Sequence, residues 1–201
     1  AFFVTTNNDP NVSLILWRFA YCGVILIPVF FLHVVFLLTE KFKRFLLFFS
    51  YFQCIVFIFL SLNGVMFKNV RFMFNSFYYA QGGIIYLSSF LIWIFLALIG
   101  HHLLMKFYIK NKDTQYLLFL IHAILGFGGG IMNFLPGFNI KVYPFGNFLI
   151  PFYVVIMTYT IFKYQILDIK FVIQKGLVYS VLVTLITVSY LILILVAERL
   201  F

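Results

Sequence analysis

The sequence predicts an all-α protein, a polytopic bundle of transmembrane helices. Hydrophobic residues make up 65% of the 201 residues and charged residues 9%, and the mean hydropathy is +1.11. A soluble domain is nearer half apolar and a quarter charged. The apolar residues also fall in continuous runs of roughly 20 residues, the length that crosses a bilayer core. A soluble fold of this size could not bury so much apolar surface, so we expect one membrane domain over residues 1–201.

Six runs meet this length. They cover residues 17–38, 45–66, 83–105, 116–135, 145–163 and 177–197. Tyrosine and tryptophan side chains near the ends of the runs, such as Trp17, Tyr78 and Tyr79, are typical of anchors at the membrane–water interface.

Basic residues gather in alternate connections between the runs. The connections after the first, third and fifth runs contain nine: Lys41, Lys43, Arg44, Lys106, Lys110, Lys112, Lys163, Lys170 and Lys175. The other two connections contain Lys68, Arg71 and Lys141. The positive-inside rule therefore places loops 39–44, 106–115 and 163–176 in the cytoplasm. The formal net charge of +9 then reflects topology, and we expect no nucleic-acid partner.

The ends of the chain indicate a piece of a longer protein. The first residues, AFFVTTNNDP, include neither Met nor the basic start of a signal peptide. An even number of spans leaves both ends outside the cytoplasm. A cytoplasmic module after Phe201 would therefore need one more span.

The glycine cluster GFGGG in the fourth run predicts close helix packing. Gly126 and Gly130 are four residues apart and share one helix face, where two glycines leave a groove for a neighbouring helix. Gly128 and Gly129 lie between them, and a kink that faces a ligand is the alternative. A phosphate-binding loop is excluded because no Lys-Ser/Thr pair follows.

The segment after this cluster predicts a short external loop, residues 136–147, which could also hold a ligand. Its prolines, glycine and asparagines are typical of a break between two helices: Asn133, Pro136, Pro144, Gly146, Asn147 and Pro151. Pro151 falls within the first two turns of the fifth run, where its missing N–H costs least.

Four histidines are the candidates for cofactor chemistry: His33, His101, His102 and His122. The predicted topology puts all four in the cytoplasmic leaflet, at similar depth. Neutral imidazoles on facing helices could ligate haem or a transition metal. Histidines near an interface more often pack or bond to the backbone, so we expect no metal and no cofactor. A membrane electron carrier is the alternative function, and a Soret band would identify it.

Acidic residues fall outside the spans. Asp9, Glu40, Asp113, Asp168 and Glu198 all lie in loops or at run edges. Proton-coupled transporters usually carry a carboxylate within the membrane. The absence of such a carboxylate disfavours a transporter or channel, which we keep as the third candidate function.

Other polar residues of the runs predict structural roles, and no catalytic set of residues is recognisable. Gln53, Asn63 and Ser88 are expected to hydrogen-bond between helices. Arg18, at the edge of the first run, is expected to extend toward the headgroups.

The segment KYQILDIKFVIQKGLVYS, residues 163–180, joins the fifth and sixth runs and predicts an interfacial helix. Its polar residues Asp168, Lys170 and Lys175 are candidates for coupling the membrane region to the cytoplasm.

This segment resembles the end of the N-terminal 7TM region of bacterial sensor histidine kinases. LWRFAYCGVILIPVFFLH, residues 16–33, is similar to the start of such regions, and GFGGG, NFLP and YPFGN are similar to their middle. The resemblance implies two spans before residue 1 and one after Phe201. It also implies a bacterial inner-membrane location and a dimeric cytoplasmic output module, usually a histidine kinase core. It does not identify the stimulus.

Overall fold

The structure, a computed structural model, describes residues 9–164. The chain divides into two compact units, residues 1–157 and 158–201. Within the described part, five helices are long and apolar enough to cross a membrane, which confirms there the prediction of a polytopic helical protein. The sixth predicted run, 177–197, lies outside the described residues.

The first two helices form a pair. Helix α2 spans Pro10–Thr39 and α3 spans Arg44–Leu62. Helix α2 begins seven residues before the predicted run because the Asp9 side chain accepts the amide hydrogens of Asn11 and Val12, and proline suits the first helical position. It ends where Glu40 adopts a left-handed conformation, with φ 52°.

A β-hairpin follows α3, in the connection that the sequence predicted between the second and third runs. Strand β1 spans Phe67–Met73 and pairs antiparallel with β2, Phe77–Gly82. The turn between them has positive φ at both central residues, Phe74 and Asn75. This is the pattern of a type I′ turn, which matches the right-handed twist of paired strands.

The next two helices form a second pair. Helix α4 spans Ile84–Asn111 and α5 spans Thr114–Ile131. The predicted loop 106–115 is therefore wrong in its extent, since only Lys112 and Asp113 separate the helices. Lysine is a good helix former, and its long stem lets the last turns of α4 pass through the interface while the ammonium groups reach water.

Beyond α5 the chain turns through three short 3₁₀ helices before α6. These are η1, Met132–Phe134; η2, Pro136–Phe138; and η3, Phe145–Leu149. Helix α6 spans Ile150–Tyr164 and crosses the division between the two units. Proline stands at the first position of η2 and at the second of α6, where its missing N–H is tolerated.

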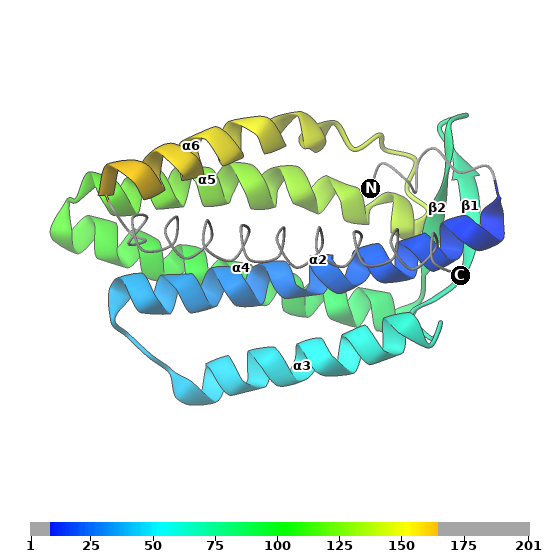
Figure 1. Cartoon of the computed structure of the whole chain (residues 1–201), viewed down its shortest axis with the longest axis horizontal. Coiled ribbons are helices and arrows are strands. Elements are labelled where there is room, and N and C mark those ends of the chain that lie inside the picture. The colour runs from blue at the N-terminus through cyan, green and yellow to red at the C-terminus, as the bar shows by residue number, and fades with distance from the viewer. Residues whose placement is uncertain (1–8, 165–201) are drawn as a thin grey trace, which may run out of the picture. The chain divides into compact units, whose positions relative to one another are not determined.

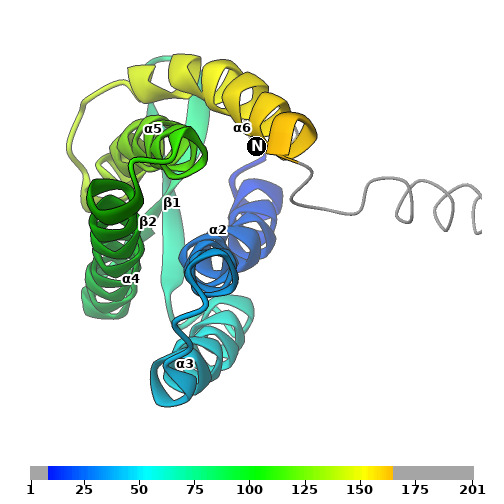
Figure 2. The ribbon, with the colours of Figure 1, turned by 90° about the vertical axis from the view of Figure 1, so that its left-hand side faces the viewer.

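Helix α2 is central to the packing of the first unit. It packs against α3 and α4 and also against both strands of the hairpin, while α5 packs against α4 and η3. Figures 1 and 2 show these helices side by side, with the hairpin at one end of α2 and the α2–α3 and α4–α5 connections at the other.

Candidate functional site

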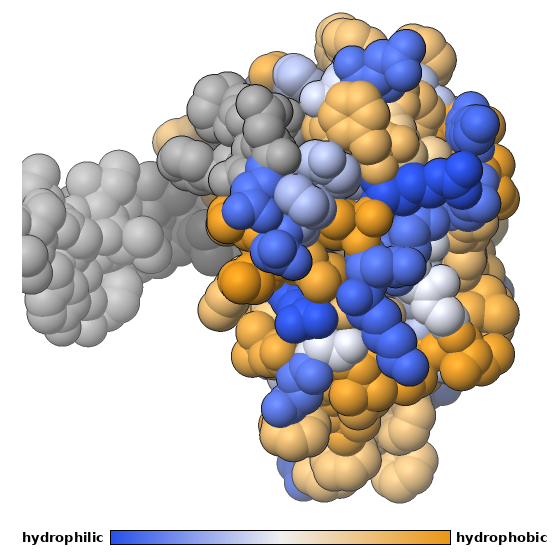
Figure 3. Space-filling view, turned by 90° about the vertical axis from the view of Figure 1, so that its right-hand side faces the viewer, coloured by the Kyte–Doolittle hydropathy of each residue, from blue (hydrophilic) through white to orange (hydrophobic). Residues whose placement is uncertain are grey.

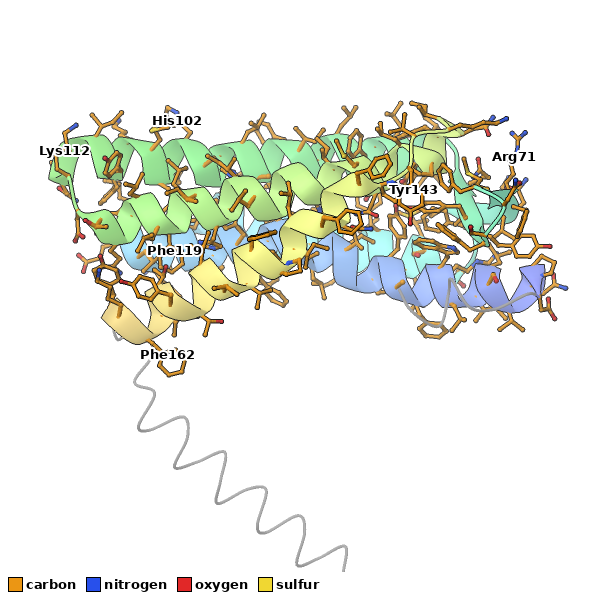
Figure 4. All side chains as sticks on the ribbon, turned by 90° about the horizontal axis from the view of Figure 1, so that it is seen from above. Arg71, His102, Lys112, Phe119, Tyr143 and Phe162 are labelled. Carbon is orange, nitrogen blue, oxygen red and sulfur yellow. The ribbon has the colours of Figure 1, made fainter. Side chains whose placement is uncertain are left out.

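The most elaborately built part of the described chain is the end that carries the hairpin. We call it the hairpin end and define it as residues 63–83 and 132–149 with the adjoining turns of α2 and α4. The opposite end, with the short connections 40–43 and 112–113, we call the basic-loop end. Figure 4 shows Arg71 and Tyr143 at the hairpin end and Lys112 at the other.

Two buried tyrosines join three segments at the hairpin end. The hydroxyl oxygens of Tyr21 and Tyr86 lie 2.6 Å apart, and the Tyr86 hydroxyl also donates to the carbonyl of Phe134 at 3.1 Å. Each phenol has one hydrogen, so Tyr21 donates to Tyr86 while Tyr86 donates to Phe134. This chain of hydrogen bonds connects α2, α4 and η1.

Glycines make room for the Tyr86 side chain. A Cβ atom on Gly82 would overlap its ring, and a Cβ on Gly137 would lie 2.7 Å from its ring carbon Cζ. The ring of Tyr86 also lies 4.7 Å from that of Phe138, measured between centroids. The hairpin and η2 therefore approach α4 closely only because these two positions lack side chains.

The hairpin is held to α2 by further polar contacts. Trp17 donates through Nε1 to the carbonyl of Tyr78 at 2.8 Å, and Arg18 donates through Nη2 to the carbonyl of Phe67 at 2.9 Å. Arg18 was expected to extend toward headgroups, and it binds the hairpin backbone instead. The Tyr79 hydroxyl donates to the carbonyl of Asn133, and burial raises the pKa of Tyr79, so this donor stays protonated at neutral pH.

A proline in α2 creates a further link between helices. Pro28 has no N–H, so the carbonyl of Val24 loses its usual partner four residues along. Trp93 of α4 donates through Nε1 to this carbonyl at 3.2 Å. An unsatisfied carbonyl in hydrocarbon is costly, so this bond couples α2 to α4.

The glycine cluster makes its closest approach at Gly129. A Cβ on Gly146 would lie 2.7 Å from the Cα of Gly129, so α5 and η3 meet backbone to backbone there. The sequence predicted a groove on Gly126 and Gly130. Gly126 faces the Tyr153 ring of α6, and a Cβ on Gly126 would lie 3.4 Å from the nearest ring carbon. Among the described residues, a Cβ on Gly130 would have its nearest neighbour in the Trp93 ring, at 4.0 Å. Within residues 9–164, a Cβ on Gly128 would meet no atom closer than 4 Å.

The polar residues of the predicted external loop form local bonds. Asn133 and Asn147 exchange hydrogen bonds between their side-chain amides, at 2.7 and 3.2 Å. Gln81 of β2 donates to the carbonyl of Pro136 at 3.2 Å. Pro144 is buried just before η3. The loop is thus tied to the hairpin on one side and closed on itself by the amide pair.

The four histidines do not converge. The Nδ1 of His33 lies 2.8 Å from the Tyr51 hydroxyl of α3. His101 and His122 each place Nδ1 on a carbonyl of their own helix, at 2.7 and 3.2 Å. A carbonyl only accepts, so Nδ1 carries the proton in both rings and Nε2 is the remaining nitrogen. Within residues 9–164 no three His, Cys, Asp or Glu side chains are grouped as metal ligands would be.

A hollow of about 510 Å³ runs along α4 and α5. Its lining is apolar except for His101 and His102 at one end. Gly128, where no side chain fills the space, is part of its wall. In a bilayer this apolar surface suits acyl chains.

The polar residues expected to bond between helices bond within their own helix instead. Gln53, Asn63 and Ser88 donate to backbone carbonyls three or four residues earlier. Two small side chains of α3 do reach the neighbouring helix α2. Ser61 donates to the carbonyl of Arg18 at 3.0 Å, and Cys54 donates to that of Ile25 at 3.4 Å.

Sequence reasoning missed the hairpin and therefore the tyrosine chain. Residues 67–82 are rich in Phe and Tyr and are bounded by Asn63–Gly64 and Gly82–Gly83, which is a recognisable strand signal. Tyr78 and Tyr79 were instead interpreted as anchors at the membrane–water interface, because aromatic residues suit an interface as well as a strand. The coupling candidates Asp168, Lys170 and Lys175 lie outside the described residues.

The fold indicates a multi-pass membrane protein. No protein-family model, curated protein or solved structure matches the chain.

Proposed function

We propose that this chain is the membrane-embedded sensing and anchoring region of a bacterial signalling protein; the motifs described above resemble those of the N-terminal 7TM region of sensor histidine kinases. The hydrogen-bonded chain from Tyr21 through Tyr86 to Phe134 is the observation that carries the proposal. It ties the hairpin end to α2, α4 and η1, so a stimulus that alters this end acts on several helices together. The carboxylates Asp9, Glu40 and Asp113 also suit a sensor more than a proton-coupled transporter, since all three cap helix ends.

The mechanism is a shift between two packings of the helices. A stimulus drives such a shift only if it binds the two packings with different affinity. Helix α2 is suited to transmit it, because it contacts the hairpin as well as α3 and α4. The output is a cytoplasmic module of the same protein, which the resemblance makes a dimeric kinase core.

In this proposal the hairpin end faces the outside of a bacterial inner membrane and the basic-loop end faces the cytoplasm. The charge distribution supports this orientation, since Lys41, Lys106 and Lys110 cluster with other cations at the basic-loop end.

Cysteine labelling tests the orientation. With Cys22 and Cys54 replaced by Ala, Ser76→Cys at the hairpin turn should react with a membrane-impermeant maleimide on intact spheroplasts. Lys110→Cys should react only after the membrane is opened. The reverse pattern would overturn the orientation.

Activity of the intact protein tests the signalling role. The sequence after Phe201 should encode one further span and then an output module with a phosphorylatable histidine. In that intact protein, Tyr86→Phe should change stimulus-dependent phosphorylation, and Gly126→Leu with Gly130→Leu should block helix movement. Unchanged signalling in both variants, with normal expression, would contradict the proposed route.

A further inference from the structure

A second hollow, of about 440 Å³, lies at the tip of the hairpin. Its wall consists of the end of β1, the turn and one residue of the following loop region: Arg71, Phe72, Met73, Phe74, Asn75 and Lys141. All six lie outside the five candidate spans. We therefore expect the hollow to face the aqueous phase or the headgroup layer.

Two cations from distant parts of the chain meet at this hollow. Arg71 belongs to β1, and Lys141 follows η2. Arg71 donates through Nη1 to the side-chain oxygen of Asn139. An amide oxygen is neutral, so this bond orients the guanidinium without compensating its charge.

None of the three carboxylates in residues 9–164 lines this hollow. Asp9 caps α2 through the amides of Asn11 and Val12, and Glu40 and Asp113 belong to the basic-loop end. Figure 3 looks onto the hairpin end, where hydrophilic residues gather across the middle of the face and hydrophobic residues lie around them. An uncompensated pair of cations beside exposed aromatic rings is what an anion with an apolar neighbour requires.

The turn at the tip of the hairpin places Phe74 in a strained backbone conformation. Phe74 has a φ of 57°, a conformation that bulky residues rarely adopt. Its ring packs against Phe77 and, at a centroid distance of 5.3 Å, edge-on against Tyr143. This contact joins the hairpin tip to the segment after η2, and so keeps Arg71 and Lys141 on the same hollow.

We propose that this hollow binds a phosphate group. The guanidinium fork of Arg71 matches two phosphate oxygens, and the ammonium of Lys141 takes a third as a point charge. The phosphate belongs either to a lipid headgroup at the membrane surface or to a free molecule in the aqueous phase. The site goes beyond the proposed function, because it would bind phosphate whether or not the chain signals.

The test uses the 201-residue protein in nanodiscs of phosphatidylcholine. One arm titrates inorganic phosphate by calorimetry, against chloride at matched ionic strength. The other arm adds phosphatidylglycerol and counts the lipids retained per protein by native mass spectrometry. Binding in the first arm indicates a free ligand, and selective retention in the second indicates a headgroup; either result supports the site.

Three charge-removing variants decide whether the site is specific. Arg71→Gln and Lys141→Gln should each weaken binding about tenfold or more, the expected effect of losing one charge-assisted hydrogen bond. Lys68→Gln removes the same charge from the same strand but outside the hollow, and should change binding less than about twofold. Lys141 makes no hydrogen bond within the described residues, so its variant should fold normally. Equal losses in all three variants, or no phosphate binding in either arm, would overturn the proposal.

Discussion

The two ends of the described helices are connected in different ways. At the hairpin end the connections 63–83 and 132–149 are long, and they fold back over the helices as a hairpin and 3₁₀ turns. Their backbone groups bond to Trp17, Arg18, Tyr79 and Tyr86. At the basic-loop end the connections have two to four residues and leave their charges in water.

Two cations at the basic-loop end lie over aromatic rings of α4. Lys41 lies 5.3 Å from the ring centre of Phe107, and Lys112 lies 5.7 Å from that of Tyr108. Such exposed contacts are weak, about 0.5–1 kcal/mol each. The difference teaches that connection length decides where specific structure forms: long connections can bury polar groups, and short ones leave them to solvent. We therefore expect substitutions to cost far more at the hairpin end.

The largest expected effect comes from the backbone contact between α5 and η3. Gly146→Ala or Gly129→Ala forces a methyl group into backbone that cannot yield, and should lower the free energy of unfolding by about 3 kcal/mol. Unfolding in mixed micelles measures this. Gly128→Ala, whose methyl group would meet open space, is the matched control and should be neutral within about 0.5 kcal/mol. Equal losses at positions 128 and 129 would show that this contact does not hold the hairpin end.

Next comes the removal of one buried hydroxyl. Tyr86→Phe leaves the Tyr21 hydroxyl and the Phe134 carbonyl without partners and should cost about 2 kcal/mol. Tyr108→Phe makes the same chemical change at the basic-loop end and keeps the ring beneath Lys112, so its effect should be close to zero. If the two variants lose equal stability in the same micelle assay, the contrast between the ends is wrong.

A smaller effect should appear where the proline of α2 meets α4. Trp93→Phe removes the donor to the Val24 carbonyl and should cost about 1 kcal/mol from the lost bond. In a Pro28→Ala background, residue 28 regains an N–H that can serve this carbonyl. The same tryptophan substitution should then cost less, and a double-mutant cycle measures the coupling. A coupling energy of zero would mean that the proline and the tryptophan act independently.

The smallest effect compares two residues with nearly the same positive φ. Lys112 at the basic-loop end and Phe74 at the hairpin turn have φ of 56° and 57°. Glycine relieves this conformation, so Lys112→Gly should stabilise the protein by about 0.5 kcal/mol. Phe74→Gly should not, because it also loses the ring contacts with Phe77 and Tyr143. Equal gains at both positions would show that those contacts contribute nothing.

Much of the helical framework was predictable because its signals are local. The runs 45–66, 83–105 and 116–135 correspond to α3, α4 and α5. Most of the predicted ends lie within four residues of the ends of these helices, and the exception is the C-terminal end of α4. The main errors came where a local signal has two meanings. The lysines after residue 105 were interpreted as the start of a cytoplasmic loop because of their charge. Lysine is also a good helix former, and α4 continues through Lys106 and Lys110. The Asp9–Pro10 pair that starts α2 was present in the sequence and was overlooked.

The candidate site was less predictable for a physical reason. The sequence marks Gly126, Gly129, Asn133 and Gly146 as unusual residues, but their partners depend on how segments meet. Spacing of four along a helix marks Gly126 and Gly130, whereas the closest approach in space is made by Gly129, because η3 crosses α5 at that turn. The spacing of residues along one helix does not specify where the neighbouring segment packs against it.

By itself, then, the sequence determined that the chain is a multi-pass membrane protein with cations concentrated in alternate connections, because hydrophobic length and charge act locally. Only the tertiary structure decided which polar groups share a bond. Tyr21 and Tyr86 are 65 residues apart, Tyr86 and Phe134 are 48 apart, and Trp93 and Val24 are 69 apart. Such pairs form where packing leaves a buried donor or acceptor without water, and each of these groups then bonds to the partner that the fold brings within reach.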